Sequence, residues 1–265
     1  VTADNQSMLD LARKLNIEIE STFGELNYDT YNLSNLTFNG KYAKDNLAMN
    51  QCQFQLNGDQ LKLNGNIQDL MAYVYENKTL SGAIAVESPN FNLTKFMGEE
   101  PATNEATAEE PFLVPENMDF KINFNIGKLI YDKLQLDKLR GNLVVSNNTI
   151  HINEMMSSAL GGNMALNGIY NTADKNKPTF DLKYDLRSVQ FPKALDQILS
   201  FKQLAPITKF IEGLFNSSFS AKGILGKNMM PDLSTLSASG LIETLNGAIK
   251  GYKPIEGLAE KLNIG

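Results

Sequence analysis

The chain has few side chains suited to nucleophilic or metal chemistry, and their positions do not combine into a site. It contains one histidine, His151, and one cysteine, Cys52. A Ser-His-Asp triad could use only His151, and zinc sites built from several Cys and His ligands need more of both. His151 lies between Ile150 and Ile152, so we expect it on the solvated face of a strand. We expect Cys52 to be a buried or half-buried strand residue that takes part in no internal disulfide.

Other chemical motifs are also missing. Gly161-Gly162 is typical of a hairpin turn, and no glycine-rich phosphate-binding pattern is present. Residues 98–117 contain no Lys or Arg and hold six glutamates, which account for the whole formal net charge of −6. The rest of the chain is therefore balanced in charge and offers no basic patch for nucleic acid. We expect no enzyme, no metal and no cofactor.

The elements that would position a site are mainly strands. Hydrophobic residues make up 42% of the chain, and its 30 asparagines often alternate with apolar residues. Met118, Phe120, Ile122, Phe124 and Ile126 show this period of two most clearly. Such alternation predicts strands with one buried and one solvated face. Between residues 49 and 52 the phase slips by one residue, which indicates a β-bulge.

Helical periodicity is limited to short segments. Helices are expected at 7–16, 191–201, 206–214 and 254–263. Further strands are expected at 134–146, 149–158, 162–171, 179–188, 217–226 and 235–250. No apolar run is long enough to span a bilayer as a helix. The chain opens on Val1, which favours a processed or excised piece of a longer protein.

An internal repeat is the strongest signal. Leu33-Ser-Asn-Leu36 recurs as Leu136-Asp-Lys-Leu139, and Leu61-Lys-Leu-Asn-Gly65 recurs as Met164-Ala-Leu-Asn-Gly168, both at an offset of 103 residues. Asn46–Asn50 recurs at the same offset as Thr149–Asn153, and the block at 79–91 recurs at 179–191. Each copy is expected to be a run of about four strands, with a partial third copy from Phe219.

The predicted fold is mainly β with a few short helices, an α+β arrangement. Tandem repeats would join edge to edge into a long curved antiparallel sheet that forms a groove or half-pipe. We divide the chain into a first repeat with an N-terminal helix (1–97), an acidic flexible loop (98–117), a second repeat (118–201) and a C-terminal part of helices and strands (202–265).

The segment from Leu225 to Leu262 carries a family resemblance. Its sequence, including Leu-Ile-Glu-Thr-Leu-Asn-Gly-Ala-Ile-Lys-Gly-Tyr-Lys-Pro at 241–254, resembles the C-terminal region of AsmA-like envelope proteins in the form found in Bacteroides-type bacteria. The L-x-G strand pattern upstream is also similar. The resemblance implies a periplasmic body, an inner-membrane anchor outside this sequence, and a part in outer-membrane biogenesis. It also implies an apolar trough that carries lipid acyl chains.

The working hypothesis is a lipid-binding or lipid-conducting groove whose partner is phospholipid or another acyl-chain lipid. An uncovered apolar sheet face needs an apolar partner, and acyl chains fit a groove without directional contacts. One alternative is that these residues form a core closed under the chain's own helices. The other is an envelope assembly protein with a closed core and no lipid, which contacts other envelope proteins through its sheet edges or helices. The expected groove residues are Leu36, Phe38, Leu61, Leu63, Ile84, Val86, Phe120, Ile122, Phe124, Ile150, Ile152, Leu166, Leu182 and Tyr184.

Overall fold

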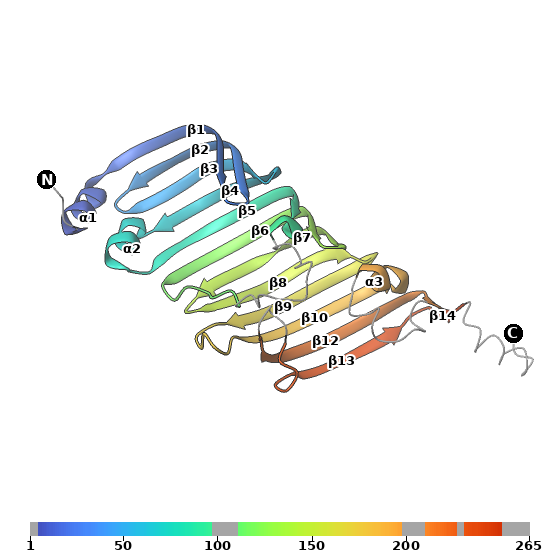
Figure 1. The fold of residues 1–265 in the computed structure, drawn as a ribbon. Helices are drawn as coiled ribbons and strands as arrows, with labels where there is room; N and C mark the ends of the chain where they lie inside the picture. The colour runs from blue at the N-terminus through green and yellow to red at the C-terminus, as the bar shows by residue number, and fades with distance from the viewer. Residues whose placement is uncertain (1–4, 97–110, 198–209, 227–230, 251–265) are drawn as a thin grey trace, which may run out of the picture.

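Twelve strands form one continuous open sheet (Figure 1). The computed structural model describes residues 5–96, 111–197, 210–226 and 231–250. The sheet order follows the chain from β1 to β10 and continues with β12 and β13, while β11 (Ile211–Glu212) pairs with β14 (Ala248–Ile249). This confirms the predicted class, a mainly β chain with a long curved sheet. The strands of the large sheet are β1 (Asn16–Tyr28), β2 (Tyr31–Ala43), β3 (Asn46–Leu56), β4 (Asp59–Gln68), β5 (Leu80–Asn92), β6 (Met118–Tyr131), β7 (Leu134–Ser146), β8 (Thr149–Ala159), β9 (Gly162–Asn171), β10 (Thr179–Gln190), β12 (Leu214–Ile224) and β13 (Ser237–Thr244).

The internal repeat is visible in the backbone itself. Strands β2, β3 and β4 recur as β7, β8 and β9 with bounds displaced by 103 residues at both ends. The left-handed backbone positions recur at the same offset, because turns and bulges fall at equivalent places. The pairs with positive φ are Asp29 and Asp132, Asn35 and Lys138, Lys44 and Asn147, Asp45 and Asn148, Asn57 and Leu160, and Gly58 and Gly161.

Each repeat has five strands, one more than the sequence indicated, and this number explains the single parallel pair. β1 to β5 are joined as antiparallel neighbours, so β5 runs in the direction of β1. A copy placed beside the first begins with β6 in that same direction, and β5 therefore pairs with β6 in parallel. Parallel neighbours need a long crossover, which residues 93–117 provide. The large sheet is therefore mostly antiparallel, with this one parallel pair where the two repeats meet.

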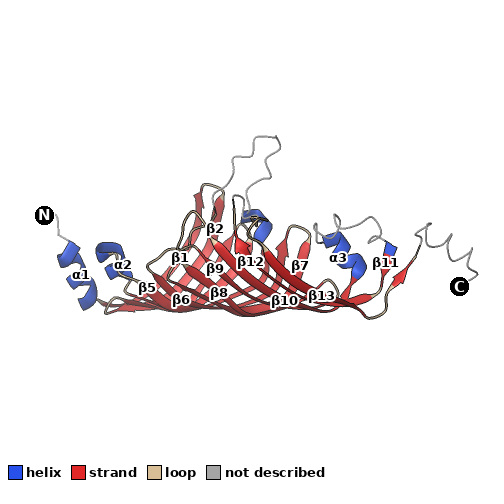
Figure 2. Ribbon diagram, turned by 90° about the horizontal axis from the view of Figure 1, so that it is seen from below, coloured by secondary structure: helices blue, strands red, loops and turns tan. Residues whose placement is uncertain are grey.

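The helices are short and lie toward the ends of the strands (Figures 1 and 2). They are α1 (Asn5–Lys14), α2 (Leu70–Glu76), the 3-10 turn η1 (Leu93–Phe96) and α3 (Phe191–Gln197). The periodicity predicted α1 and α3 to within a few residues. It missed α2, whose apolar run Leu-Met-Ala-Tyr-Val-Tyr shows no helical stripe. The helix expected at 254–263 lies outside the described residues.

The helix expected at 206–214 is wrong in its described part. Ile211–Glu212 form strand β11, which pairs with β14 (Ala248–Ile249), and Leu214 begins β12. The apolar spacing at 207–214 fits a helix, but β10 presents an open backbone edge to this segment. Pairing runs from Gln190↔Leu214 to Thr179↔Ile224 and satisfies that edge. Long-range hydrogen bonding thus overrides the local pattern.

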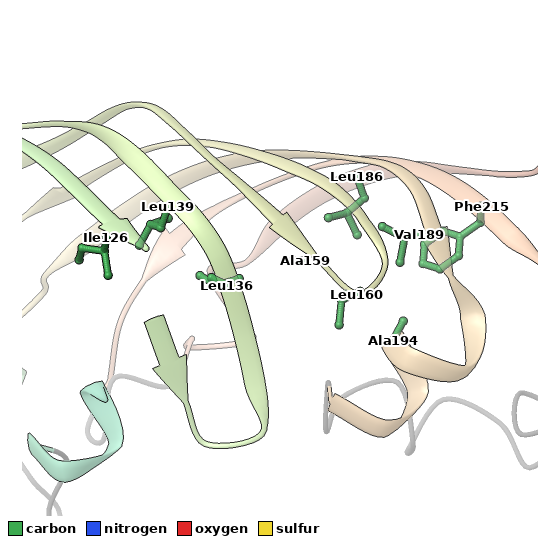
Figure 3. Packing of buried hydrophobic residues seen from close by; sticks show 9 residues of the cluster. All are labelled: Ile126, Leu136, Leu139, Ala159, Leu160, Leu186, Val189, Ala194 and Phe215. Carbon is green, nitrogen blue, oxygen red and sulfur yellow. The ribbon is translucent and has the colours of Figure 1, made fainter. Parts of the chain in front are cut away.

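The molecule has little of the two-layer packing of ordinary domains. Among the described residues, large apolar side chains such as Leu11, Leu26 and Leu241 are more than half exposed. One cluster of buried apolar residues lies where the ends of the strands meet α3 and the loops (Figure 3). This cluster consists of Ile126, Leu136, Leu139, Ala159, Leu160, Leu186, Val189, Ala194 and Phe215.

Candidate functional site

One face of the sheet is apolar from edge to edge, and we call it the floor. Strand registers define a central row that crosses all twelve strands, one residue from each. Its members are Ile19, Gly40, Met49, Gly65, Ile84, Ile122, Leu143, Ile152, Gly168, Leu182, Ala221 and Ala238. No residue of this row has a polar side chain. With strands spaced about 4.8 Å apart, the row is roughly 50 Å long.

The opposite face is polar at the same level of the sheet. The neighbouring row contains Glu18, Lys41, Ala48, Asn66, Ala83, Lys121, Val144, His151, Ile169, Asp181, Lys222 and Ser237. Eight of the twelve residues in this row have polar side chains, and Ala48, Ala83, Val144 and Ile169 are the exceptions. The two faces therefore differ on most strands, as the alternation of the sequence predicts. A surface with one solvated and one apolar side needs an apolar partner on the second side only.

All fourteen residues expected in the groove lie on the floor. Ile84, Ile122, Ile152 and Leu182 belong to the central row. The next row holds Phe38, Leu63, Val86, Phe124, Leu166 and Tyr184, and the rows outside these two hold Leu36 and Leu61 on one side and Phe120 and Ile150 on the other.

Most of the expected groove residues keep part of their surface in contact with solvent. Leu61 and Phe120 are buried, whereas the other twelve expected groove residues are half-buried. A core closed under the chain's own helices would bury most of these side chains. Among the described residues, α3 and η1 pack at one end of the strands and α1 and α2 at the other (Figures 1 and 2). The middle of the floor therefore keeps contact with solvent.

The floor residues absent from the expected set include Met49 and Leu143 of the central row and Met155 of the next row. Met49 precedes and Met155 follows a register shift, and these bulges break the simple alternation. Leu143 lies in the run Leu-Val-Val, in which consecutive apolar residues hide the face that each occupies. The repeat could have identified Met49, because the offset of 103 residues aligns it with Ile152.

Glycines let floor side chains lie flat against the backbone. A Cβ on Gly40 would lie 2.8 Å from Cζ of Phe38, and a Cβ on Gly141 would lie 2.9 Å from Cζ of Phe124. A Cβ on Gly168 would likewise meet the side chain of Leu182 at 2.5 Å. Rings and branched side chains therefore cover the glycine backbone, which keeps the floor apolar where side chains are absent.

A buried aspartate anchors the floor at the corner where α2 begins. Oδ1 of Asp45 accepts hydrogen bonds from the Tyr42 hydroxyl (3.1 Å) and the Met71 amide (2.7 Å), and Oδ2 accepts one from the Ala72 amide (3.0 Å). Asp69 occupies the N-cap position but makes no side-chain capping bond. Burial, together with the adjacent Asp45 carboxylate, raises the pKa of Tyr42 to about 12.

The second repeat replaces α2 with a loop that holds the returning crossover. Val114, which is 2% exposed, donates its amide to Oγ1 of Thr172 (3.0 Å) and accepts a bond from Nδ2 of Asn148 (3.1 Å). The Tyr170 hydroxyl donates to the carbonyl of Phe112 (2.6 Å). The crossover is thereby fixed at the end of the floor where β6 starts.

The two residues that could take part in nucleophilic or metal chemistry, His151 and Cys52, lie apart from each other. His151 pairs with Val144 and Ile169 on the polar face, as expected, and Cys52 is buried on the floor between Phe38 and Leu63. Burial raises the pKa of the Cys52 thiol, which keeps it protonated and unreactive at neutral pH. No group of three potential metal ligands occurs within the described ranges.

A depression of about 430 Å³ on the polar face is lined partly by Lys138, Arg140, Asp185 and Arg187. Nη2 of Arg187 lies 3.0 Å from Oδ1 of Asp185, which also accepts a bond of 2.6 Å from the Ser218 hydroxyl. Both ionic side chains are more than half exposed. Exposed ion pairs of this kind contribute little binding energy, so this depression adds nothing to the floor.

A model described as the AsmA family matches residues 2–247 of the chain. A search of curated proteins found no match. None of the helices in the described part of the chain is long and apolar enough to cross a membrane.

Proposed function

This chain belongs to the AsmA family, and we propose that its floor binds phospholipid or another acyl-chain lipid and conducts it along the sheet. The family is associated with the bacterial envelope. The proposal includes a periplasmic location, attachment to the inner membrane through an anchor outside these 265 residues, and a role in outer-membrane biogenesis. It assigns the chain no catalytic step.

The observation that carries the proposal is the central row of the floor. Twelve consecutive strands each contribute a residue without a polar side chain to it. When an acyl chain displaces water from half-buried apolar side chains, each methylene that becomes buried makes the binding free energy more favourable by about 0.8 kcal/mol. The row of roughly 50 Å exceeds the depth of one bilayer leaflet, about 15 Å. It therefore has room for successive acyl-chain positions.

The same row supports movement as well as binding. Directional polar contacts hold a ligand at one place, because leaving that place breaks hydrogen bonds. The central row offers none, so neighbouring positions along it differ little in energy for an acyl chain. A groove open on one side would also leave the polar headgroup in water, where its charge needs no partner.

The experiment places one carboxylate on either face of the same strand. Ile122→Asp puts it on the central row, and Asn123→Asp puts it on the polar face. Purified protein is analysed by lipid extraction and native mass spectrometry, and by titration with a fluorescent fatty acid. Wild-type protein and Asn123→Asp should retain lipid, whereas Ile122→Asp should lose most of it. Ala221→Asp, on the same row in β12, repeats the test if Ile122→Asp fails to fold.

Two results would overturn the proposal. Wild-type protein that carries no lipid and binds no fluorescent fatty acid would favour the alternative, an envelope assembly protein with a closed core and no lipid. Equal lipid content in the Ile122→Asp and Asn123→Asp variants, with both folded, would show that any bound lipid lies away from the floor.

A further inference from the structure

β1 is the counterpart of β6 in the repeat. Gly24-Glu-Leu-Asn-Tyr-Asp29 recurs as Gly127-Lys-Leu-Ile-Tyr-Asp132, at the offset of 103 residues. Asp29 and Asp132 both follow their strands with nearly equal positive φ, 53° and 52°. Tyr28 pairs with Tyr31 at the hairpin, as Tyr131 pairs with Leu134. The two strands therefore occupy equivalent places in their repeats.

Their surroundings differ on one side only. β6 lies between β5 and β7, whereas β1 has β2 on one side and forms the edge of the sheet on the other. β1 is 13 residues long and contains no proline, and none of the described strands pairs with its outer edge. In the second repeat the equivalent edge is filled by β5 in parallel, from Leu80↔Met118 to Asn92↔Ile130.

Gly24 is a residue type that a closely approaching strand would require, yet none of the described strands lies beside it on the outer edge of β1. In β6, a Cβ on Gly127 would lie 2.5 Å from the carbonyl oxygen of Pro89 on β5, so only glycine allows this approach. Gly24 occupies the equivalent position in β1, and a Cβ there would meet nothing within 4 Å. Its φ is outside the left-handed region, so its own backbone does not require glycine either.

The apolar side chains of β1 are more exposed than their counterparts in β6. Ile17 and Phe23 are 44% and 46% exposed, whereas their counterparts Phe120 and Ile126 in β6 are each 8% exposed. Leu26 and Tyr28 at the end of β1 are 53% and 76% exposed. A further strand beside β1 would continue the floor and cover part of this surface.

We propose that the free edge of β1 binds a parallel strand of the β5 type, with a proline opposite Gly24. The register of β5 on β6, transferred to β1, sets small side chains such as those of Ala83 and Ala85 opposite Glu18 and Glu20, and no like charges face each other. Strands β5 and β10 of a second copy cannot serve, because both of their edges are already paired. The partner is therefore a β5-type segment from outside these 265 residues.

The test uses a fluorescently labelled peptide with the sequence of residues 79–92 and the full chain. Anisotropy should show saturable binding, and amide hydrogen exchange should slow in β1 when peptide is present. Gly24→Ala should fold with an unchanged or slightly higher Tm, because its Cβ has open space, yet it should weaken peptide binding at least tenfold. Ser21→Ala on the same strand and a scrambled peptide serve as controls.

The outcomes separate this proposal from lipid binding, since peptide binding is measured on delipidated and lipid-loaded protein alike. Absence of peptide binding to wild-type protein would overturn it, as would equal binding to the wild-type and Gly24→Ala proteins. Protection of β1 amides without peptide, together with a dimer in solution, would show that a second copy occupies this edge instead.

Discussion

Replacing Asp45 by asparagine tests how the sheet holds α2 at the end of the floor. Asp45 is 4% exposed and accepts three hydrogen bonds through its two carboxylate oxygens. An asparagine amide has one acceptor oxygen and one NH₂ group. If its oxygen keeps the bond from Met71, its NH₂ group faces the Ala72 amide, and two donors then oppose each other.

The cost follows from these contacts. Loss of a charge-assisted bond costs about 1.5–3 kcal/mol, and a buried donor without a partner costs about 1–3 kcal/mol. Because the two costs overlap at one amide, we expect Asp45→Asn to lower the free energy of unfolding by about 2–4 kcal/mol. The backbone adds no strain, since Asp45 has a φ of 62°, which asparagine also tolerates.

Asp69→Asn is the matched control. Asp69 also has a left-handed backbone (φ 60°) and adjoins the first turn of α2, but it makes no side-chain capping bond. Both changes remove one negative charge near the same helix end, so the difference between them isolates the hydrogen bonds. We expect a change below about 0.5 kcal/mol for Asp69→Asn, measured by urea unfolding at pH 7 with circular dichroism. Equal losses in the two variants would refute the hydrogen-bond account and favour helix-end electrostatics.

Three further predictions concern buried groups. Leu139→Ala should lower the free energy of unfolding by about 3 kcal/mol because it opens a cavity in the packed end of the sheet. Leu241→Ala, at a 70% exposed position, should change it by less than about 0.5 kcal/mol. Similar values for the two variants in urea unfolding would contradict the assigned core. The raised pKa of Tyr42, about 12 against an ordinary 10.0, favours the protonated folded state, so its contribution is complete below pH 10 and lost as the pH rises through 12. Tyr42→Phe should therefore flatten the decline of stability between pH 10 and 12. Cys52 should react with an aromatic disulfide reagent at pH 8 at least about tenfold more slowly than in urea, and equal rates would show that it is accessible.

Much of the fold follows from local patterns. Period-two alternation predicts the strands of both repeats, and the offset of 103 residues predicts which of them correspond. The alternation also separates the faces, because consecutive side chains of a strand point to opposite sides. For this reason residues as distant as Leu36 and Tyr184 could be assigned to one face before any pairing was known.

Where local patterns failed, a distant partner decided the structure. The apolar spacing at 207–214 favours a helix, yet the open edge of β10 draws Leu214 and the residues after it into a strand. α2 has no helical stripe, and its first turn depends on hydrogen bonds to Asp45. The two amides that donate these bonds lie 26 and 27 residues after Asp45 in the chain. Neither partner can be identified from spacing along the chain.

The sequence by itself therefore determined the strands, the repeat and the apolar composition of one face. The tertiary structure decided how the repeats join in parallel, which ends are packed, and that the middle of the floor stays half-exposed. The physical reason is how far apart along the chain the interacting residues lie. The face of a strand residue depends on the position of its neighbours along the chain, whereas burial depends on whether a second layer arrives from elsewhere. Across the described part of this sheet, the helices lie at the strand ends, and the middle of the apolar face remains available.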